Sequence, residues 1–185
     1  MNAEDKYLMG MLWKFGTIKP GTNQFVFQSY DKYEQMEYIR KRIAPDKTIK
    51  VSTRKDPRTG TEKTLYRLNF TNEEWADKVR MYEGINAEKI IDKEFARGFL
   101  ETKGTVSKYG KTKRYSLSGT SDELSLISKE LIKTCEVNDL KINIKSTGSG
   151  ALTYSISDVS KIVSSFSTKN PKYWGDILKK MNPDD

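Results

Sequence analysis

An internal repeat is the feature that most constrains how this 185-residue chain can fold. The segment YLMGMLWKFGTI at residues 7–18 aligns with FARGFLETKGTV at residues 95–106, at a shift of 88 residues. The matching pairs are Gly10/Gly98, Leu12/Leu100, Gly16/Gly104, Thr17/Thr105 and Ile18/Val106. A repeat period of 88 residues is long enough for a whole structural unit, so the alignment predicts a duplicated architecture.

The sequence that follows each copy runs in parallel as well. FVFQSYD at residues 25–31 matches YSLSGTS at residues 115–121, and each segment ends in a helix-start signal before an amphipathic run. The chain therefore reads as two degenerate copies of a unit of about 90 residues. We predict a first repeat at residues 1–90 and a second at residues 91–185, with Asp92 or its neighbours at the boundary.

Within each copy, apolar residues alternate between two periods. Helical spacing occurs in residues 33–43 and 124–131, and each copy closes with a further helix, at 72–82 and 157–166. A period of two, typical of strands with one buried face, occurs in Phe25–Phe27, Ile49–Val51, Tyr66–Phe70, Tyr115–Leu117, Ile142–Ile144 and Leu152–Ile156. The predicted fold class is α+β, with two pseudo-symmetric αββαββα repeats, antiparallel sheets and a final helix near 172–181.

The composition excludes several kinds of chemistry. The chain has no His and a single Cys135, which rules out His-dependent catalysis, His–zinc sites and an internal disulfide. A zinc site is therefore not expected, and the single Cys indicates a reduced, cytoplasmic setting. We also expect no other metal site and no cofactor. No apolar run is long enough for a membrane helix, so no membrane partner is expected. The net charge of +8 favours an anionic partner, of which nucleic acid is the commonest.

The residues that alternate with the buried strand positions are polar or basic. An ordinary solvent-facing sheet usually mixes charges of both signs, whereas these strand faces contain no acidic residue. They favour a sheet laid against phosphates, with Gln and Arg able to reach base edges. The candidate DNA-binding residues are Gln24, Gln28, Lys50, Arg54, Arg58, Arg67, Lys108, Lys111, Arg114, Lys141 and Lys145, of which Arg58, Lys108 and Lys111 are assigned to hairpin tips.

Two glycine-punctuated helices about 90 residues apart, each followed by the same order of strands and helices, resemble the two-repeat, single-chain branch of the LAGLIDADG homing endonuclease family. The resemblance covers roughly residues 4–170. It implies that the motif helices, residues 8–16 and 96–104, pack on each other about a pseudo-twofold axis, and that the two sheets form a saddle over double-stranded DNA. Gly10 and Gly98 would allow the helices to approach closely, while Gly16 and Gly104 would turn the chain from helix into strand.

The sequence departs from the family pattern at the catalytic positions. In that family an acidic residue at the eighth motif position ligates the metal ions that cut DNA. Here Phe15 and Lys103 occupy those positions, and neither side chain binds Mg²⁺. Glu101 remains at the sixth position of the second motif, where a helix-end carboxylate paired with Arg97 or Lys103 is the simpler interpretation. Glu101-Thr-Lys103 also matches the tail of another nuclease motif, but it ends a helix and has no upstream Asp on a neighbouring strand.

Three classes of function remain open. The first, which we favour, is a monomeric, sequence-specific double-stranded DNA-binding protein derived from a homing endonuclease, no longer a nuclease, that regulates or occludes its site. The second is a residual endonuclease or nickase that uses Mg²⁺ and recruits Glu101. The third is a protein-interaction module or an RNA-binding, maturase-like cofactor that keeps only the scaffold.

Overall fold

A computed structural model describes residues 1–13, 15–56, 60–82, 88–144 and 148–182. The elements of the first half are α1 (Ala3–Leu12), β1 (Thr17–Ile18), β2 (Gln24–Ser29), α2 (Tyr33–Ile43), β3 (Lys50–Lys55), β4 (Glu62–Thr71) and α3 (Glu73–Met81). Those of the second half are α4 (Lys93–Lys103), β5 (Thr105–Tyr109), β6 (Thr112–Gly119), α5 (Ser121–Cys135), β7 (Asn143–Ile144), β8 (Gly150–Tyr154) and α6 (Ile156–Phe166), followed by α7 (Pro171–Met181). The order αββαββα thus occurs twice.

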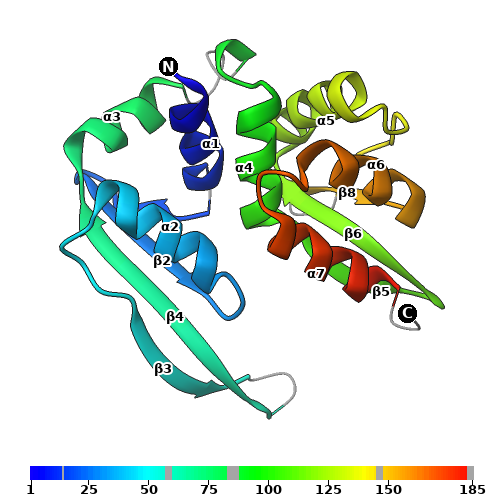
Figure 1. Ribbon diagram of the computed structural model, residues 1–185. Helices are drawn as coiled ribbons and strands as arrows, with labels where there is room; N and C mark the ends of the chain where they lie inside the picture. The colour runs from blue at the N-terminus through cyan, green and yellow to red at the C-terminus, as the bar shows by residue number, and fades with distance from the viewer. Residues whose placement is uncertain (14, 57–59, 83–87, 145–147, 183–185) are drawn as a thin grey trace.

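The strands form two four-stranded antiparallel sheets, ordered β1-β2-β4-β3 and β5-β6-β8-β7. Helices α1 and α4 lie side by side between the sheets, and the other helices pack against one face of each sheet (Figure 1). This arrangement confirms the α+β class with two antiparallel sheets. Within the described ranges, no helix is long and apolar enough to cross a membrane.

The two halves bury equivalent strand positions. In each sheet two neighbouring cross-strand pairs face the helices, and all eight side chains are at most 2% exposed. These pairs are Phe25 with Phe70 and Phe27 with Leu68 in the first sheet, and Tyr115 with Tyr154 and Leu117 with Leu152 in the second. Because alternate residues point to opposite faces, these pairs also fix which residues lie on the outer face of each sheet.

The contact between α1 and α4 depends on two glycines. A Cβ atom at Gly10 would lie 2.1 Å from the carbonyl oxygen of Phe95, and one at Gly98 would lie 2.1 Å from the carbonyl oxygen of Tyr7. Each glycine therefore faces the backbone of the opposite helix. The residue that it faces lies about one turn before the glycine of that helix. No other residue allows this approach, since a real Cβ atom does not come so close to a backbone atom.

Gly16 and Gly104 are required for space and not for an unusual backbone conformation. Gly104 caps α4 with φ −70° and ψ 134°, which any residue can adopt. A Cβ atom there would lie 1.7 Å from the Tyr115 hydroxyl oxygen, and at Gly16 it would lie 2.5 Å from the Phe27 ring. The expectation that these glycines supply a special turn geometry is therefore replaced by a packing requirement.

Lys32 joins the first half of the chain to the end of α4. Its ammonium group donates hydrogen bonds to the carbonyl oxygens of Glu101, at 3.1 Å, and Gly104, at 2.9 Å. These carbonyls lie at the negative end of the helix dipole, where a cation is favourable. Lys32 is 6% exposed, and this burial lowers its pKa from the ordinary 10.5 to about 8.

Two predicted core positions, Val51 and Ile144, are instead 60% and 62% exposed. Strand β3 is exposed along its whole length, because it is an edge strand in the part of the first sheet that extends beyond the helices (Figure 1). Strand β7 is also an edge strand and has only two residues. The period of two correctly predicts strands here but not how far the helices cover them.

We expect Gly98→Ala to lower the free energy of unfolding by about 3 kcal/mol, because the new methyl group must push apart two backbones. Gly175→Ala is the matched control, since Gly175 lies within α7 with no atom within 4 Å of an added Cβ. It should raise the free energy of unfolding by about 0.5–1 kcal/mol through helix propensity. Urea denaturation of both variants measures the difference, and equal effects would contradict the close helix contact.

The buried Lys32 predicts a pH dependence of stability. The Lys32 ammonium loses its proton near pH 8 in the folded chain but near pH 10.5 in the unfolded chain. Above pH 8 the unfolded state therefore binds more protons, and the free energy of unfolding should rise with pH. Between pH 8 and 9.5 the expected gain is about 1.5 kcal/mol. Lys32→Met removes the titrating group at similar length, so denaturant unfolding of this variant should lack that gain. Identical pH profiles for parent and variant would show that Lys32 is not buried as a cation.

Candidate nucleic-acid interface

The outer face of the first sheet contains a row of three long polar side chains. Gln28 on β2 lies opposite Arg67 on β4, which lies opposite Lys50 on β3. The Arg67 guanidinium donates a long hydrogen bond of 3.4 Å to the Gln28 side-chain oxygen. The strand register thus places three of the predicted residues next to each other on one surface.

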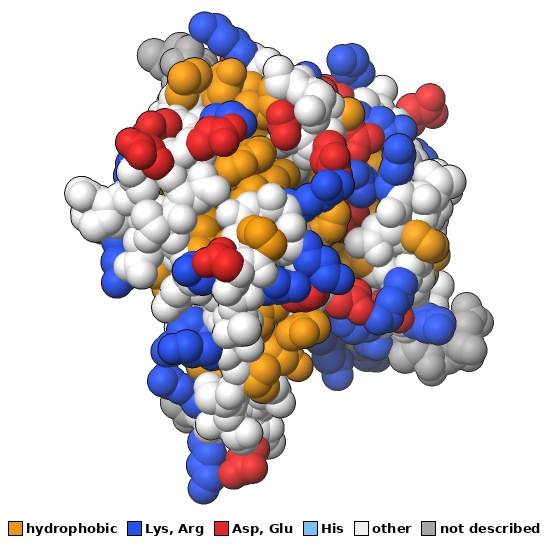
Figure 2. Space-filling view, turned by 60° about the vertical axis from the view of Figure 1, so that its left-hand side comes forward, with side chains coloured by type: hydrophobic (Ala, Val, Ile, Leu, Met, Phe, Trp, Pro, Cys, Tyr) orange, Lys and Arg blue, Asp and Glu red, His pale blue; other side chains and the backbone are white. Residues whose placement is uncertain are grey.

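The same face continues toward both ends of the sheet. Gln24 lies opposite Thr71 at one end, and Arg54 lies opposite Lys63 at the other. Asp56 follows β3 and accepts a hydrogen bond of 2.6 Å from the Lys63 ammonium, so the face ends in an ion pair. Lys and Arg side chains are gathered on the projecting lower part of the molecule, which is the β3–β4 hairpin (Figure 2).

The outer face of the second sheet contains mainly small hydroxyl side chains. Thr105, Ser116 and Thr153 form one row across three strands. Arg114 lies opposite Ser107 in the next row and is half-buried. Arg114 is therefore on the face where the sequence predicts it, among residues with much shorter side chains.

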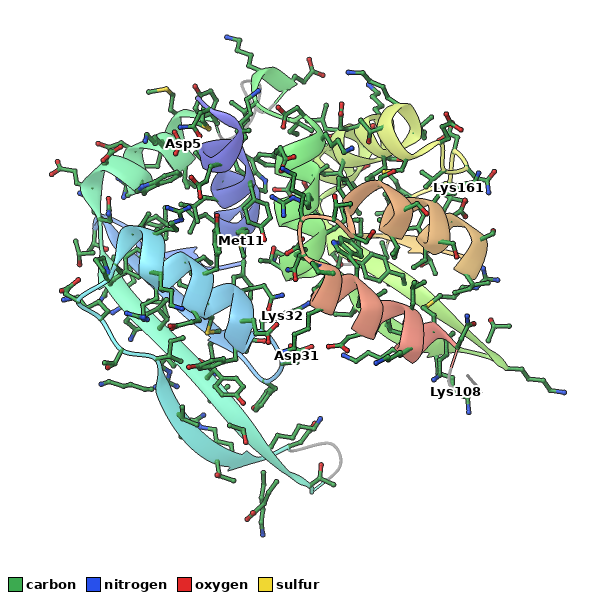
Figure 3. The ribbon with its side chains drawn as sticks, viewed as in Figure 1. Asp5, Met11, Asp31, Lys32, Lys108 and Lys161 are labelled. Carbon is green, nitrogen blue, oxygen red and sulfur yellow. The ribbon has the colours of Figure 1, made fainter. Side chains whose placement is uncertain are left out.

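Of the other candidates in the second half, Lys108 does not join this face. Lys108 lies within β5, and its register with Lys113 places it on the alternate face from Arg114. It lies near the far end of the β5–β6 hairpin, where Lys111 is in the turn (Figure 3). The tip assignment of Lys108 thus needs correction, because β5 extends through Tyr109. Lys141 is exposed but precedes β7.

Two further candidates, Arg58 and Lys145, lie outside the described residues.

Among the described residues at the ends of the motif helices, no cluster of metal-ligating side chains occurs. Phe15 packs on the core, with its ring 5.4 Å from the Phe27 ring, and Lys103 is half-buried. The Lys32 ammonium already occupies the carbonyl end of α4. No group of three or more acidic or Cys side chains that could hold a metal occurs in the part of the chain described. The residues present therefore do not fit the divalent ions that the resemblance to homing endonucleases implies.

Glu101 is enclosed by a hydrogen-bond network and not open to solvent. Its residue exposure is 0%, and one carboxylate oxygen accepts hydrogen bonds of 2.7 Å from the Tyr7 hydroxyl and from the Asn170 amide. Its other oxygen lies 3.6 Å from the Arg97 guanidinium. Burial raises the pKa of Glu101 and outweighs these favourable contacts. The carboxylate links α1, α4 and the start of α7, so the expected pairing with Arg97 is only part of its environment.

Lys32 lies between the two halves and was not among the residues predicted from the sequence (Figure 3). One signal could have identified it: Lys32 is the N-cap residue of α2, where its side chain makes no capping hydrogen bond. A cation is unfavourable at a helix N-terminus, and the preferred N-cap residues are Ser, Thr, Asp and Asn. A Lys at this position therefore calls for a partner elsewhere, here the end of α4.

No protein-family model and no curated protein matches the sequence. Among solved structures, the chain is similar to the homing endonuclease I-WcaI bound to its DNA recognition sequence, with a TM-score of 0.63 and 15% identity over 97% of this chain and 85% of that one. It is also similar to the N-terminal LAGLIDADG domain of DUF199/WhiA, with a TM-score of 0.59 and 14% identity over 96% and 88% of the two chains.

The homing endonuclease I-DmoI in complex with DNA and Mn is a third similar structure, with a TM-score of 0.51 and 14% identity over 88% of this chain and 95% of that one. At such identities the similarity concerns the fold. Together with the duplicated αββαββα order and the glycine contact of α1 with α4, it shows that this chain has the LAGLIDADG homing endonuclease fold.

Proposed function

We propose that this protein binds double-stranded DNA sequence-specifically through the outer faces of its two sheets. The observation that carries the proposal is the row of Gln28, Arg67 and Lys50, which places hydrogen-bonding and cationic side chains together on an accessible sheet face. Arg and Gln can read base edges in the major groove, and Lys can neutralise phosphates. The net charge of +8 and the DNA complexes of the similar folds I-WcaI and I-DmoI support the same partner.

We further propose that the protein does not cut DNA and acts by regulating or occluding its site, as a monomer in the cytoplasm. The geometry of the helix ends supports this, since Phe15 packs against the core and Glu101 is buried among hydrogen-bond donors. A cationic Lys32 at the end of α4 would repel a divalent ion. Nuclease chemistry through Glu101 would require this network to open.

We expect duplex binding to weaken steeply as salt rises, with a log–log slope of roughly −0.9 for each neutralised phosphate. Replacing Lys50, Arg54, Arg67 and Arg114 by Ala should lower the affinity by about tenfold or more at moderate salt and flatten the slope. The matched control replaces Lys129, Lys133, Lys161 and Lys179 by Ala, which removes the same charge from helices α5, α6 and α7.

Fluorescence anisotropy over a salt series distinguishes the two variants. Equal losses in both would indicate that only net charge matters, and undiminished binding of the sheet variant would favour the interaction-module alternative. Single-stranded RNA of the same sequence serves as the competitor that tests the maturase-like alternative.

We expect no cleavage of duplex DNA containing a selected binding site, in either Mg²⁺ or Mn²⁺. The measurement is conversion of a supercoiled plasmid carrying that site to nicked or linear forms. Site-specific cutting that is lost in Glu101→Gln, with binding retained, would contradict the proposal and identify Glu101 as a nuclease residue.

A further inference from the structure

The outer faces of the two sheets differ at structurally equivalent positions. The buried pair of Phe25 with Phe70 corresponds to that of Tyr115 with Tyr154, which aligns the two sheets residue by residue. The positions that follow these pairs on three strands of each sheet can then be compared directly. The row formed by Gln28, Arg67 and Lys50 in the first sheet corresponds to Ser118, Ala151 and Asn143 in the second.

At these equivalent positions the second sheet has shorter side chains, which extend less far from the sheet. Arg67 can form paired hydrogen bonds with guanine, whereas Ala151 at the equivalent position has no polar side-chain atom. Ser118 replaces an amide of longer reach with a short hydroxyl. The first outer face has several accessible long polar side chains, namely Gln24, Gln28, Lys50, Arg54, Lys63, Arg67 and Asn69. The described second outer face has Arg114 and Asn143.

One of these side chains in the first sheet, Arg67, also has a hydrogen-bond partner on the same face. Arg67 lies between two long neighbours on adjacent strands, and its hydrogen bond to Gln28 restricts the guanidinium before any DNA arrives. Restricting a side chain in advance reduces the entropy lost on binding. In the second sheet Ser107 and Ser116 lie 3.4 Å apart and hydrogen-bond to each other. Such hydroxyl groups suit phosphate or water contacts, which are largely indifferent to base identity.

We propose that base discrimination is concentrated in the half of the DNA site that lies under the first sheet, and that the second sheet holds its half mainly through backbone contacts. This inference rests on the proposed DNA-binding function. It predicts a target in which one half-site is strongly specified and the other tolerates change. Arg114 is the exception, since it occupies the position equivalent to Gln24 and provides one long donor to the second half.

The test is a single-base-pair substitution scan across a duplex selected from a random library. Each substituted duplex competes with the parent duplex for binding at fixed salt. We expect losses of about tenfold or more at several base pairs in one half-site and losses below about threefold across most of the other. An iron–EDTA group on Pro20→Cys, in the exposed β1–β2 turn, identifies which half lies under the first sheet, because the sole native Cys135 is buried.

Matched variants assign the effect to side chains. Arg67→Ala should erase the penalty at one or two base pairs of the specified half, and Arg67→Lys, which keeps the charge, should not restore it. Ser118→Ala, at the position equivalent to Gln28, should leave the scan nearly unchanged. Circular dichroism confirms that each variant is folded.

The outcomes separate the two proposals. Penalties spread evenly over both half-sites, or concentrated under the second sheet, would overturn this inference while leaving DNA binding intact. A protein that does not bind duplex DNA in a salt-dependent way would overturn the proposed function itself.

Discussion

The backbone contact between α1 and α4 is the constraint on which the rest of the structure depends. At Gly10 and Gly98 the two helices approach so closely that a single added methyl group would overlap a carbonyl oxygen of the partner helix. That approach sets the separation of the two halves, and the two β-sheets follow directly from the ends of these helices. The distance between the two outer faces therefore depends on the absence of side chains at Gly10 and Gly98. The proposed placement of both outer faces along one DNA duplex requires such a short, rigid connection.

The far end of α4 forms a structural junction. Lys32 reaches from the first half to the last carbonyls of α4, and Glu101 accepts hydrogen bonds from Tyr7 of α1 and from Asn170 before α7. Both groups are almost fully buried. Burial lowers the pKa of Lys32 and raises that of Glu101, so in each case it favours the neutral form. The charged forms of Lys32 and Glu101 need their hydrogen-bond partners, because an unpaired buried charge is costly. These groups are therefore fixed in position, unlike carboxylates that must bind a hydrated metal ion.

Much of the fold followed from the sequence, because the repeat and the two hydrophobic periods are local signals. They correctly predicted the order of helices and strands and, through alternation, the shared outer face of Gln28, Lys50 and Arg67. What could not be predicted depends on contacts between distant segments. Val51 has the right period for a buried residue, but nothing in its neighbourhood reveals that the helices end short of β3. The partner of Lys32 lies about 70 residues away, so only its odd position at a helix N-terminus could have drawn attention.

The two repeats have diverged more on their surfaces than in their cores, and the physical reason explains the asymmetry of the proposed interface. A core residue contacts many neighbours, so Phe25 could change to an aromatic equivalent such as Tyr115 but not to a polar one without a partner. Arg67 and Ala151 lie on the faces that point away from the helices, so they can differ without disturbing the core. Duplication therefore preserves the scaffold while leaving each outer face free to change. One face can retain base-reading side chains while the other keeps only groups that suit a DNA backbone.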